Sequence, residues 1–279
     1  MTHHWRQLRM QALAAGIAPR ASRLRAELAS NGGDIWIYDV IDPYGGFWGI
    51  SAAEIVQALQ PLGDAPVTVH INSPGGDVFE SIAIYNNFRA HKGQVTMVVE
   101  GVAASGASVI MVSGDRVEVA PNAQIMIHDG WGYVDGNEEK VRKYADLLGR
   151  TSQNLSGMYA AFAGGEPDDW RALMREETWY IGGDEVIAAG LAHAVTEAAQ
   201  TSSPPSQGED EMAFAAWDLS VYAKAPKNSV QVRNAEPASS ATQATTPSSK
   251  PVLVDAIAQP PAPAFDPAVF RRALEEART

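Results

Sequence analysis

The chain has 279 residues, of which 46% are hydrophobic and 8% aromatic, so it can build one sizeable core and still carry dispensable flanks. Its formal net charge of −12 argues against general affinity for nucleic acid, and no apolar run approaches the roughly 20 residues of a membrane span. The absence of cysteine excludes disulfides and thiolate metal sites. We therefore expect a soluble, unsecreted protein of the cytoplasm that binds neither nucleic acid nor membrane.

The chain opens with an arginine-rich extension, residues 1–30, whose alanines and leucines predict two short helical pieces. This extension is either a docking or removable segment or an ordinary solvated one, and its composition does not separate the two. The core, residues 31–200, is predicted to begin with a strand at residues 35–38. Ser51 and Glu54 then have the spacing of a capping box, which predicts the start of a helix.

Strands and helices alternate along the core. Strands at residues 67–71 and 95–99 are each followed by a turn and a helix, the first of which spans about residues 78–90. This order implies right-handed crossovers and a mostly parallel sheet covered by helices, which is an α/β fold. Further strands are predicted at residues 116–120 and 125–128, and further helices at about residues 138–162 and 167–175.

Two glycine-containing turns follow the two central strands. The first reads Asn72-Ser73-Pro74-Gly75-Gly76-Asp77, and the second reads Gly101-Val102-Ala103-Ala104-Ser105-Gly106-Ala107-Ser108. Parallel strands bring both turns to one edge of the sheet, where open α/β sheets place their sites. Ser105 is therefore a candidate nucleophile, and the backbone amides of Gly76 and Gly106 are candidates for an oxyanion hole.

One of the six histidines has the setting of a catalytic base. His128 ends the apolar run Ile125-Met126-Ile127 and is followed by Asp129-Gly130, so a buried strand delivers it to a sheet edge. The others are expected to be peripheral or structural: His3 and His4 near the N-terminus, His91 at a polar turn, and His70 and His193 in apolar strand-like runs.

These motifs together resemble the Clp-type serine peptidase pattern over about residues 34–197. Its parts are Asn72-Ser73-Pro74-Gly75-Gly76, then Gly101-x-Ala103-Ala104-Ser105, then Pro121-Asn122 leading into Met126-Ile127-His128, with 29 positions from Gly76 to Ser105 and 23 from Ser105 to His128. More narrowly, the chain is similar to the ClpP-like head maturation proteases of tailed bacteriophages, which often carry extra segments at both ends. The resemblance implies a ClpP/crotonase-like layered β-α-β core.

The resemblance also implies roles for particular residues. Ser105 would be the nucleophile and His128 the base, while Gly75, Asp77 and Val78 would bind the substrate backbone beside the glycine turn. No metal or nucleotide is needed for this chemistry.

The acid of the triad stays open. Aligning Trp179 with the aromatic residue of the family pattern puts Glu177 at the acid position, where it would orient His128. A one-residue slip selects Glu176 instead, and an ungapped alignment to Gly190 selects Thr178. Alternatively, Glu176 and Glu177 are only a solvated acid pair at a helix end.

Oligomerisation and the C-terminal region complete the expected organisation. The helix at residues 138–162 lies where Clp-type peptidases carry contacts between subunits. It either makes such contacts in a homo-oligomer, arranged as a ring or a stack, or is a plain surface helix. Residues 201–265 are rich in Ser, Thr, Ala and Pro and are expected to be a flexible, disordered linker. Within them, residues 212–217 form an apolar island suited to docking, and residues 266–279 are expected to form a short helix as a partner-binding tail.

The expected function is that of a serine endopeptidase. By resemblance, it would cleave scaffold protein, capsid precursor or its own termini during procapsid assembly in the host bacterial cytoplasm. Three alternatives remain: a housekeeping Clp-type peptidase fed by an ATPase unfoldase, a scaffolding protein with a dormant protease, and a crotonase-type acyl-CoA hydratase.

Overall fold

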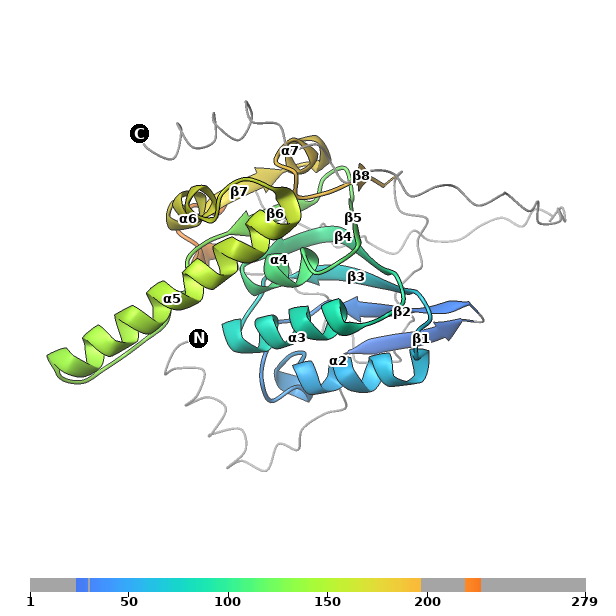
Figure 1. The fold of residues 1–279 in the computed structure, drawn as a ribbon, viewed down its shortest axis with the longest axis horizontal. Coiled ribbons are helices and arrows are strands. Elements are labelled where there is room, and N and C mark those ends of the chain that lie inside the picture. The colour runs from blue at the N-terminus through green and yellow to red at the C-terminus, as the bar shows by residue number, and fades with distance from the viewer. Residues whose placement is uncertain (1–23, 30, 197–218, 227–279) are drawn as a thin grey trace, which may run out of the picture.

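The computed structural model describes residues 24–29, 31–196 and 219–226 (Figure 1). Its sheet has the strand order β1-β2-β3-β4-β5-β8, with β6 paired to β4 and β7 paired to β6. The strands are β1 (Arg25–Ala29), β2 (Gly32–Ile37), β3 (Val67–Ser73), β4 (Val95–Ala104), β5 (Arg116–Val119), β6 (Gln124–Ile127), β7 (Thr178–Ile181) and β8 (Ala194–Val195). All pairings are parallel except β1 with β2 and β6 with β7, which confirms the predicted α/β class.

Helices cover this sheet. They are α2 (Ala52–Leu59), α3 (Val78–Ala90), α4 (Gly106–Met111), α5 (Glu138–Ala163), α6 (Pro167–Arg175) and α7 (Gly183–Ala188), with 3-10 turns η1 (Gly46–Trp48), η2 (Gln60–Leu62) and η3 (Leu219–Val221). Figure 1 shows α2, α3 and α4 in a row beside the strands, and neighbouring members of the row are in contact. The helices predicted at residues 78–90 and 167–175 are confirmed.

Local sequence signals fix where two of these helices begin. The predicted capping box is present in α2, because the Ser51 side chain accepts from the Glu54 amide and the Glu54 side chain accepts from the Ser51 amide. At α3 the Asp77 carboxylate accepts from the amides of Phe79 and Glu80. The cap of α3 thus anchors the end of the first glycine-containing turn.

Strand β4 pairs with two different strands along its length. Its first half, Thr96 to Val99, pairs with β5, and its second half, Val102 to Ala104, pairs with β6. This strand was predicted to end at residue 99, but the residues that follow, most of them small, continue it to Ala104. This division of partners brings β6, and the residue that follows it, beside the turn at the end of β4.

The sheet begins earlier in the chain than predicted. Residues up to 30 were expected to be a separate extension with helical pieces, yet Arg25–Ala29 form β1 and pair with β2. The strand lies at the sheet edge and is mostly exposed, so it lacks the buried alternation by which strands are recognised. The Asn31-Gly32 pair beside β1 is typical of a β-hairpin turn, and it was the available signal for a strand on its N-terminal side.

The long helix α5 confirms the helix predicted at about residues 138–162. Figure 1 shows its first half extending away from the rest of the domain, and its buried residues all lie from Thr151 onward. Two exposed ion pairs, Arg142–Glu138 and Lys143–Glu139, have i,i+4 spacing on the projecting half. The second half packs against α6.

Several predictions fall outside the described residues: most of the 1–30 extension, the apolar island 212–217 and the C-terminal helix at 266–279. Residues 219–226, which belong to the predicted linker 201–265, are described and contain η3. Within the described ranges, no helix has the length and apolarity needed to cross a membrane.

Candidate active site

Ser105 lies at the sharp turn between β4 and α4. Its backbone has φ 55° and ψ −125°, a region that non-glycine residues rarely adopt. The turn is tied to the neighbouring strand, because the Ser105 amide donates to the Met126 carbonyl at 2.9 Å. A strained strand-to-helix turn of this kind presents a serine hydroxyl at the sheet edge.

A buried hydrogen-bond network around Ser108 stabilises the serine turn. The Ser108 hydroxyl lies 2.6 Å from the Ser105 carbonyl and 3.0 Å from the Met126 carbonyl. The hydroxyl of Tyr159, a fully buried residue of α5, lies 2.8 Å from the Ser108 hydroxyl. Ser108 and Tyr159 were not predicted as supporting residues, since nothing in the local spacing of the sequence connects α5 with this turn.

His128 follows β6 and lies beside the serine. Its Nε2 is 2.7 Å from the Ser105 Oγ, which is hydrogen-bonding distance. Burial lowers the pKa of His128 to about 4, although the nearby charge of Glu177 opposes the shift. At neutral pH the ring is therefore uncharged, so Nε2 can accept the serine proton.

The first glycine-containing turn is held next to the serine turn. At Gly75 φ is +86°, and a Cβ there would lie 2.4 Å from the Ala104 carbonyl oxygen and 2.7 Å from the Gly106 nitrogen. The Ser73 hydroxyl, which donates to the Asp39 carbonyl, also accepts from the Gly75 amide. The two turns thus meet in direct backbone contact.

Two backbone amides of these turns are available to a ligand. The Gly75 carbonyl and the Asp77 amide are paired with Ile41, which leaves the Gly76 amide on the opposite side of the chain. Gly106 is the first residue of α4, so its amide has no partner within the helix. Among the described residues neither amide donates a hydrogen bond. The ideal Cβ position of Gly106 lies 3.5 Å from the Gly76 nitrogen, so the two amides are close neighbours.

The residues expected to bind the substrate backbone differ in how many of their own polar groups are already hydrogen-bonded. Gly75 and Asp77 use backbone groups to pair with Ile41, and Asp77 also caps α3 through its carboxylate. Val78 begins α3 and packs partly buried against the core. Of this stretch, the Gly76 peptide is the part with free backbone groups beside the serine.

The three candidates for the acid are all next to each other and have different partners. The Glu177 carboxylate accepts from the Ala223 amide at 2.9 Å and from the Lys224 amide at 2.5 Å. Glu176 pairs with the Lys224 ammonium at 2.8 Å, and the Thr178 hydroxyl donates to the Leu173 carbonyl. Within the described ranges no hydrogen bond joins any of the three to His128. Glu177 is nevertheless close enough for its charge to act on that histidine.

Residues 219–226 lie over the serine and histidine. The Tyr222 hydroxyl donates to the Pro74 carbonyl at 2.5 Å and lies close enough to Ser105 for that serine to affect the Tyr222 pKa. Its ring meets His128 edge-on at a centroid distance of 5.4 Å. Tyr222 was not among the predicted site residues, and the predicted apolar island was at residues 212–217. The cluster of apolar residues around Tyr222 in an otherwise polar stretch was the available signal.

The three other described histidines hold structural contacts. His70 lies between the carboxylates of Asp34 and Glu100, at 3.2 and 2.9 Å. The His91 ring bonds the Ala65 carbonyl, and His193 accepts from the Val117 amide. None of these rings is paired with a serine, so His128 is the described histidine in a position to act as a base. Within the described ranges no group of three or more His, Asp or Glu residues has the arrangement of a metal site.

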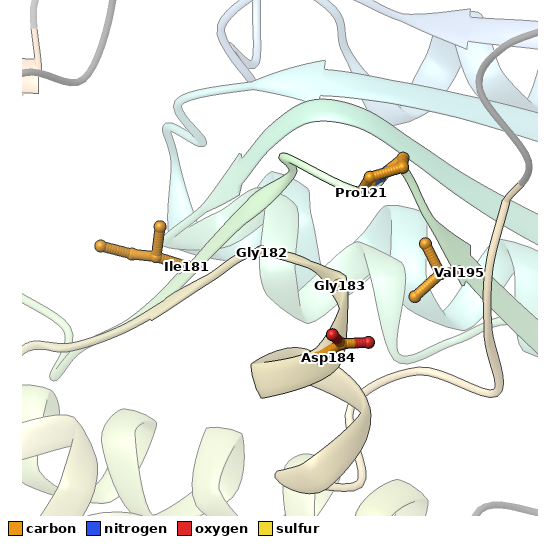
Figure 2. Close-up of a pocket in the computed structure, with 6 residues that line it drawn as sticks. All are labelled: Pro121, Ile181, Gly182, Gly183, Asp184 and Val195. Carbon is orange, nitrogen blue, oxygen red and sulfur yellow. The ribbon is translucent and has the colours of Figure 1, made fainter.

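A surface pocket lies at the other end of the β6–β7 ladder (Figure 2). It is lined by Pro121, Ile181, Gly182, Gly183, Asp184 and Val195. Ile181 pairs with Gln124 at that end of the ladder, whereas Thr178 pairs with Ile127 next to His128. The pocket is therefore separate from the serine and the histidine.

A serine at a strained strand-to-helix turn, bonded to an uncharged histidine and faced by free amides, is the arrangement typical of serine hydrolases. A protein-family model described as Clp protease matches residues 50–199, more than half of the chain and the range that holds Ser105, His128 and Glu177. The chain belongs to the Clp protease family. This membership indicates serine peptidase chemistry.

Proposed function

We propose that the protein is a serine endopeptidase that cleaves peptide bonds through an acyl-enzyme. The observation that supports this most strongly is the 2.7 Å distance between the Ser105 Oγ and the His128 Nε2. The uncharged state of His128 at neutral pH supports the same role, because only a neutral ring accepts a proton.

In the proposed reaction the Ser105 Oγ attacks the peptide carbonyl carbon while its proton passes to the His128 Nε2. The tetrahedral intermediate collapses as the C–N bond breaks, and His128 gives that proton to the leaving amine nitrogen. Water then attacks the acyl-enzyme, and one of its protons moves to His128. When the ester bond breaks, this proton returns to the Ser105 Oγ, so the enzyme is restored.

The amides of Gly76 and Gly106 would stabilise the charge that develops on the carbonyl oxygen. Their proximity supports this assignment, as does the fact that neither amide donates a hydrogen bond within the described part of the chain. Loss of one such donor costs about 3 kcal/mol of transition-state stabilisation. The proposal needs no metal or nucleotide.

We assign the acid to Glu177, which would accept from the Nδ1–H of His128 once its carboxylate is free. The effect of its charge on His128 supports this choice over Glu176 and Thr178. The test is a matched series of Glu177→Gln, Glu176→Gln and Thr178→Val. We expect a loss of kcat on the order of 10³-fold in the Glu177 variant alone. A comparable loss in either of the others, with Glu177→Gln active, would reassign the acid.

Covalent labelling tests the nucleophile and the base. A fluorophosphonate should add once to the wild type, not at all to Ser105→Ala, and at least about 10²-fold more slowly to His128→Gln. His91→Gln is the matched control, since the His91 ring hydrogen-bonds the Ala65 carbonyl and follows the C-terminal end of α3, away from the glycine-containing turn. Intact mass of each protein reports self-trimming in the same samples. A folded wild type that is neither labelled nor trimmed would contradict the proposal.

We further propose that the substrates are scaffold or capsid proteins, and the enzyme's own termini, in an assembling phage procapsid within the bacterial cytoplasm. The resemblance to head maturation proteases supports this, as do the long segments on both sides of the family-matched range. A homo-oligomer, in a ring or a stack, fits the projecting half of α5. Co-expression with capsid and scaffold proteins, with Ser105→Ala as control, tests the assignment. Normal processing by the variant would overturn it.

A further inference from the structure

Residues 219–226, which we call the covering segment, are bound in an apolar slot beside the candidate nucleophile. Leu219 and Tyr222 are 4% and 9% exposed and cluster with buried residues of the strands that lead to Ser105 and His128. These residues are Val102 and Ala104 of β4 and Met126 of β6, with Trp179 at the side. The slot is thus formed by the same strand ends that position the serine and the histidine.

Tyr222 contacts each part of the candidate site. Its hydroxyl donates to the Pro74 carbonyl in the glycine-containing turn and lies near the Ser105 hydroxyl. Its ring packs edge-on against His128 and against Trp179, with centroid distances of 5.4 and 6.0 Å. In this position the Tyr222 side chain occupies space beside Ser105 and His128 that a substrate would need.

The backbone after Tyr222 is fixed to the candidate acid. The amides of Ala223 and Lys224 both donate to the Glu177 carboxylate, and the Lys224 ammonium pairs with Glu176. Glu177 itself has φ +52° and follows the C-cap residue of α6, Glu176. The covering segment therefore occupies the substrate side of the serine and also uses the hydrogen-bonding capacity of Glu177.

We propose that the covering segment is an intramolecular ligand of the active site, bound through an aromatic subsite that also receives substrate, and that its departure clears the space beside Ser105 and frees Glu177. This inference rests on the proposed peptidase function. The walls of the subsite are apolar side chains together with the Trp179 ring, so the ligand class is a peptide with an aromatic side chain close to the scissile bond. Substrates of this class compete with the covering segment.

Labelling rates in full-length variants test the inference. Tyr222→Ala removes the contacts with Pro74, Ser105 and His128, and we expect fluorophosphonate labelling to become at least tenfold faster. Tyr222→Phe, which keeps the ring, should show a smaller increase. Val221→Ala is the matched control, because Val221 is in the same segment and 64% exposed, and its rate should equal that of the wild type. Equal rates in all four proteins would overturn the inference and leave the peptidase proposal intact.

A synthetic peptide with the sequence of residues 219–226 tests the subsite directly. Added to the Tyr222→Ala protein, it should slow labelling, and the same peptide with alanine in place of its tyrosine should not. Equal effects of the two peptides would contradict an aromatic subsite.

Hydrogen exchange separates the two proposals, because it requires no chemistry at Ser105. In a Ser105→Ala background, the amides of Ala223 and Lys224 should be protected, and Tyr222→Ala should remove the protection. Rapid exchange of these amides in both proteins would overturn the docked segment. Protection without labelling in any variant would support docking and contradict the peptidase function.

Discussion

Replacing Gly75 by alanine tests whether the contact between the two glycine-containing turns sets the activity. The new Cβ would lie 2.4 Å from the Ala104 oxygen, 2.7 Å from the Gly106 nitrogen and 2.9 Å from the Ser105 Cβ. Two of these atoms are backbone, so they cannot rotate away as the end of a flexible side chain can. The turns must therefore separate.

The size of the effect follows from this geometry. Cβ atoms rarely approach other atoms within 3.0 Å, so the turns must move apart by at least about 0.6 Å. Displacements near 1 Å cost on the order of 10²-fold in rate when they misplace reacting groups. The positive φ of Gly75 adds about 1 kcal/mol of strain for alanine. We expect labelling of Ser105 to slow by about 10²-fold and the free energy of unfolding to fall by about 2–4 kcal/mol.

Gly63→Ala is the matched control. Gly63 has a similar positive φ of +59°, but a Cβ there would meet nothing within 4 Å. It should cost about 1 kcal/mol of stability and leave the labelling rate unchanged. Fluorophosphonate kinetics and urea unfolding of both variants give the two quantities. Wild-type labelling rates in a folded Gly75→Ala protein would refute the reasoning.

Three further predictions concern stability and are measured by urea unfolding. Because burial lowers the pKa of His128 from 6.5 to about 4, the unfolded chain binds more protons between these values. The free energy of unfolding should therefore fall by about 3 kcal/mol from pH 7 to pH 4 through this group, a decrease absent in His128→Gln. Arg171→Met leaves the Asp129 carboxylate without its 3.1 Å partner and should cost about 2 kcal/mol. Ser51→Ala removes the cap of α2 and should cost about 1 kcal/mol.

Each of these predictions has an outcome that would contradict it. For His128, the contradicting outcome is an equal fall in the free energy of unfolding from pH 7 to pH 4 in the wild type and in His128→Gln. For the ion pair, the double variant Asp129→Asn with Arg171→Met should recover most of the loss, and a failure to recover would show that packing dominates. For Ser51, it is equal stability of the alanine variant and the wild type.

The neighbouring positions of Ser105 and His128 could be predicted because each follows a buried strand of one parallel sheet. That inference needed only the hydrophobic runs and the small residues after them. Their 2.7 Å contact depends on the pairing of β4 first with β5 and then with β6. This change of partner was not predicted from the sequence. Strand ends are poorly determined by local pattern where small residues allow either a turn or continued pairing.

The partners of Glu177 could not be predicted from the sequence. The Ala223 and Lys224 amides lie 46 and 47 positions away in a stretch whose composition indicates a linker. Every residue except proline has a backbone N–H, which leaves no mark in the sequence, so a carboxylate bound by such groups looks the same as a solvated one. Edge strand β1 was missed for a related reason, because an exposed strand carries little hydrophobic pattern.

The backbone at Ser105 restricts which nucleophiles this scaffold can evolve. At φ 55° a side chain branched at Cβ is strongly disfavoured, so threonine cannot take the place of serine without rebuilding the turn. Cysteine is unbranched at Cβ and meets the same backbone requirement. Of the common hydroxyl and thiol nucleophiles, cysteine is therefore the one that could replace Ser105 without a change of the backbone. The chain at present contains no cysteine.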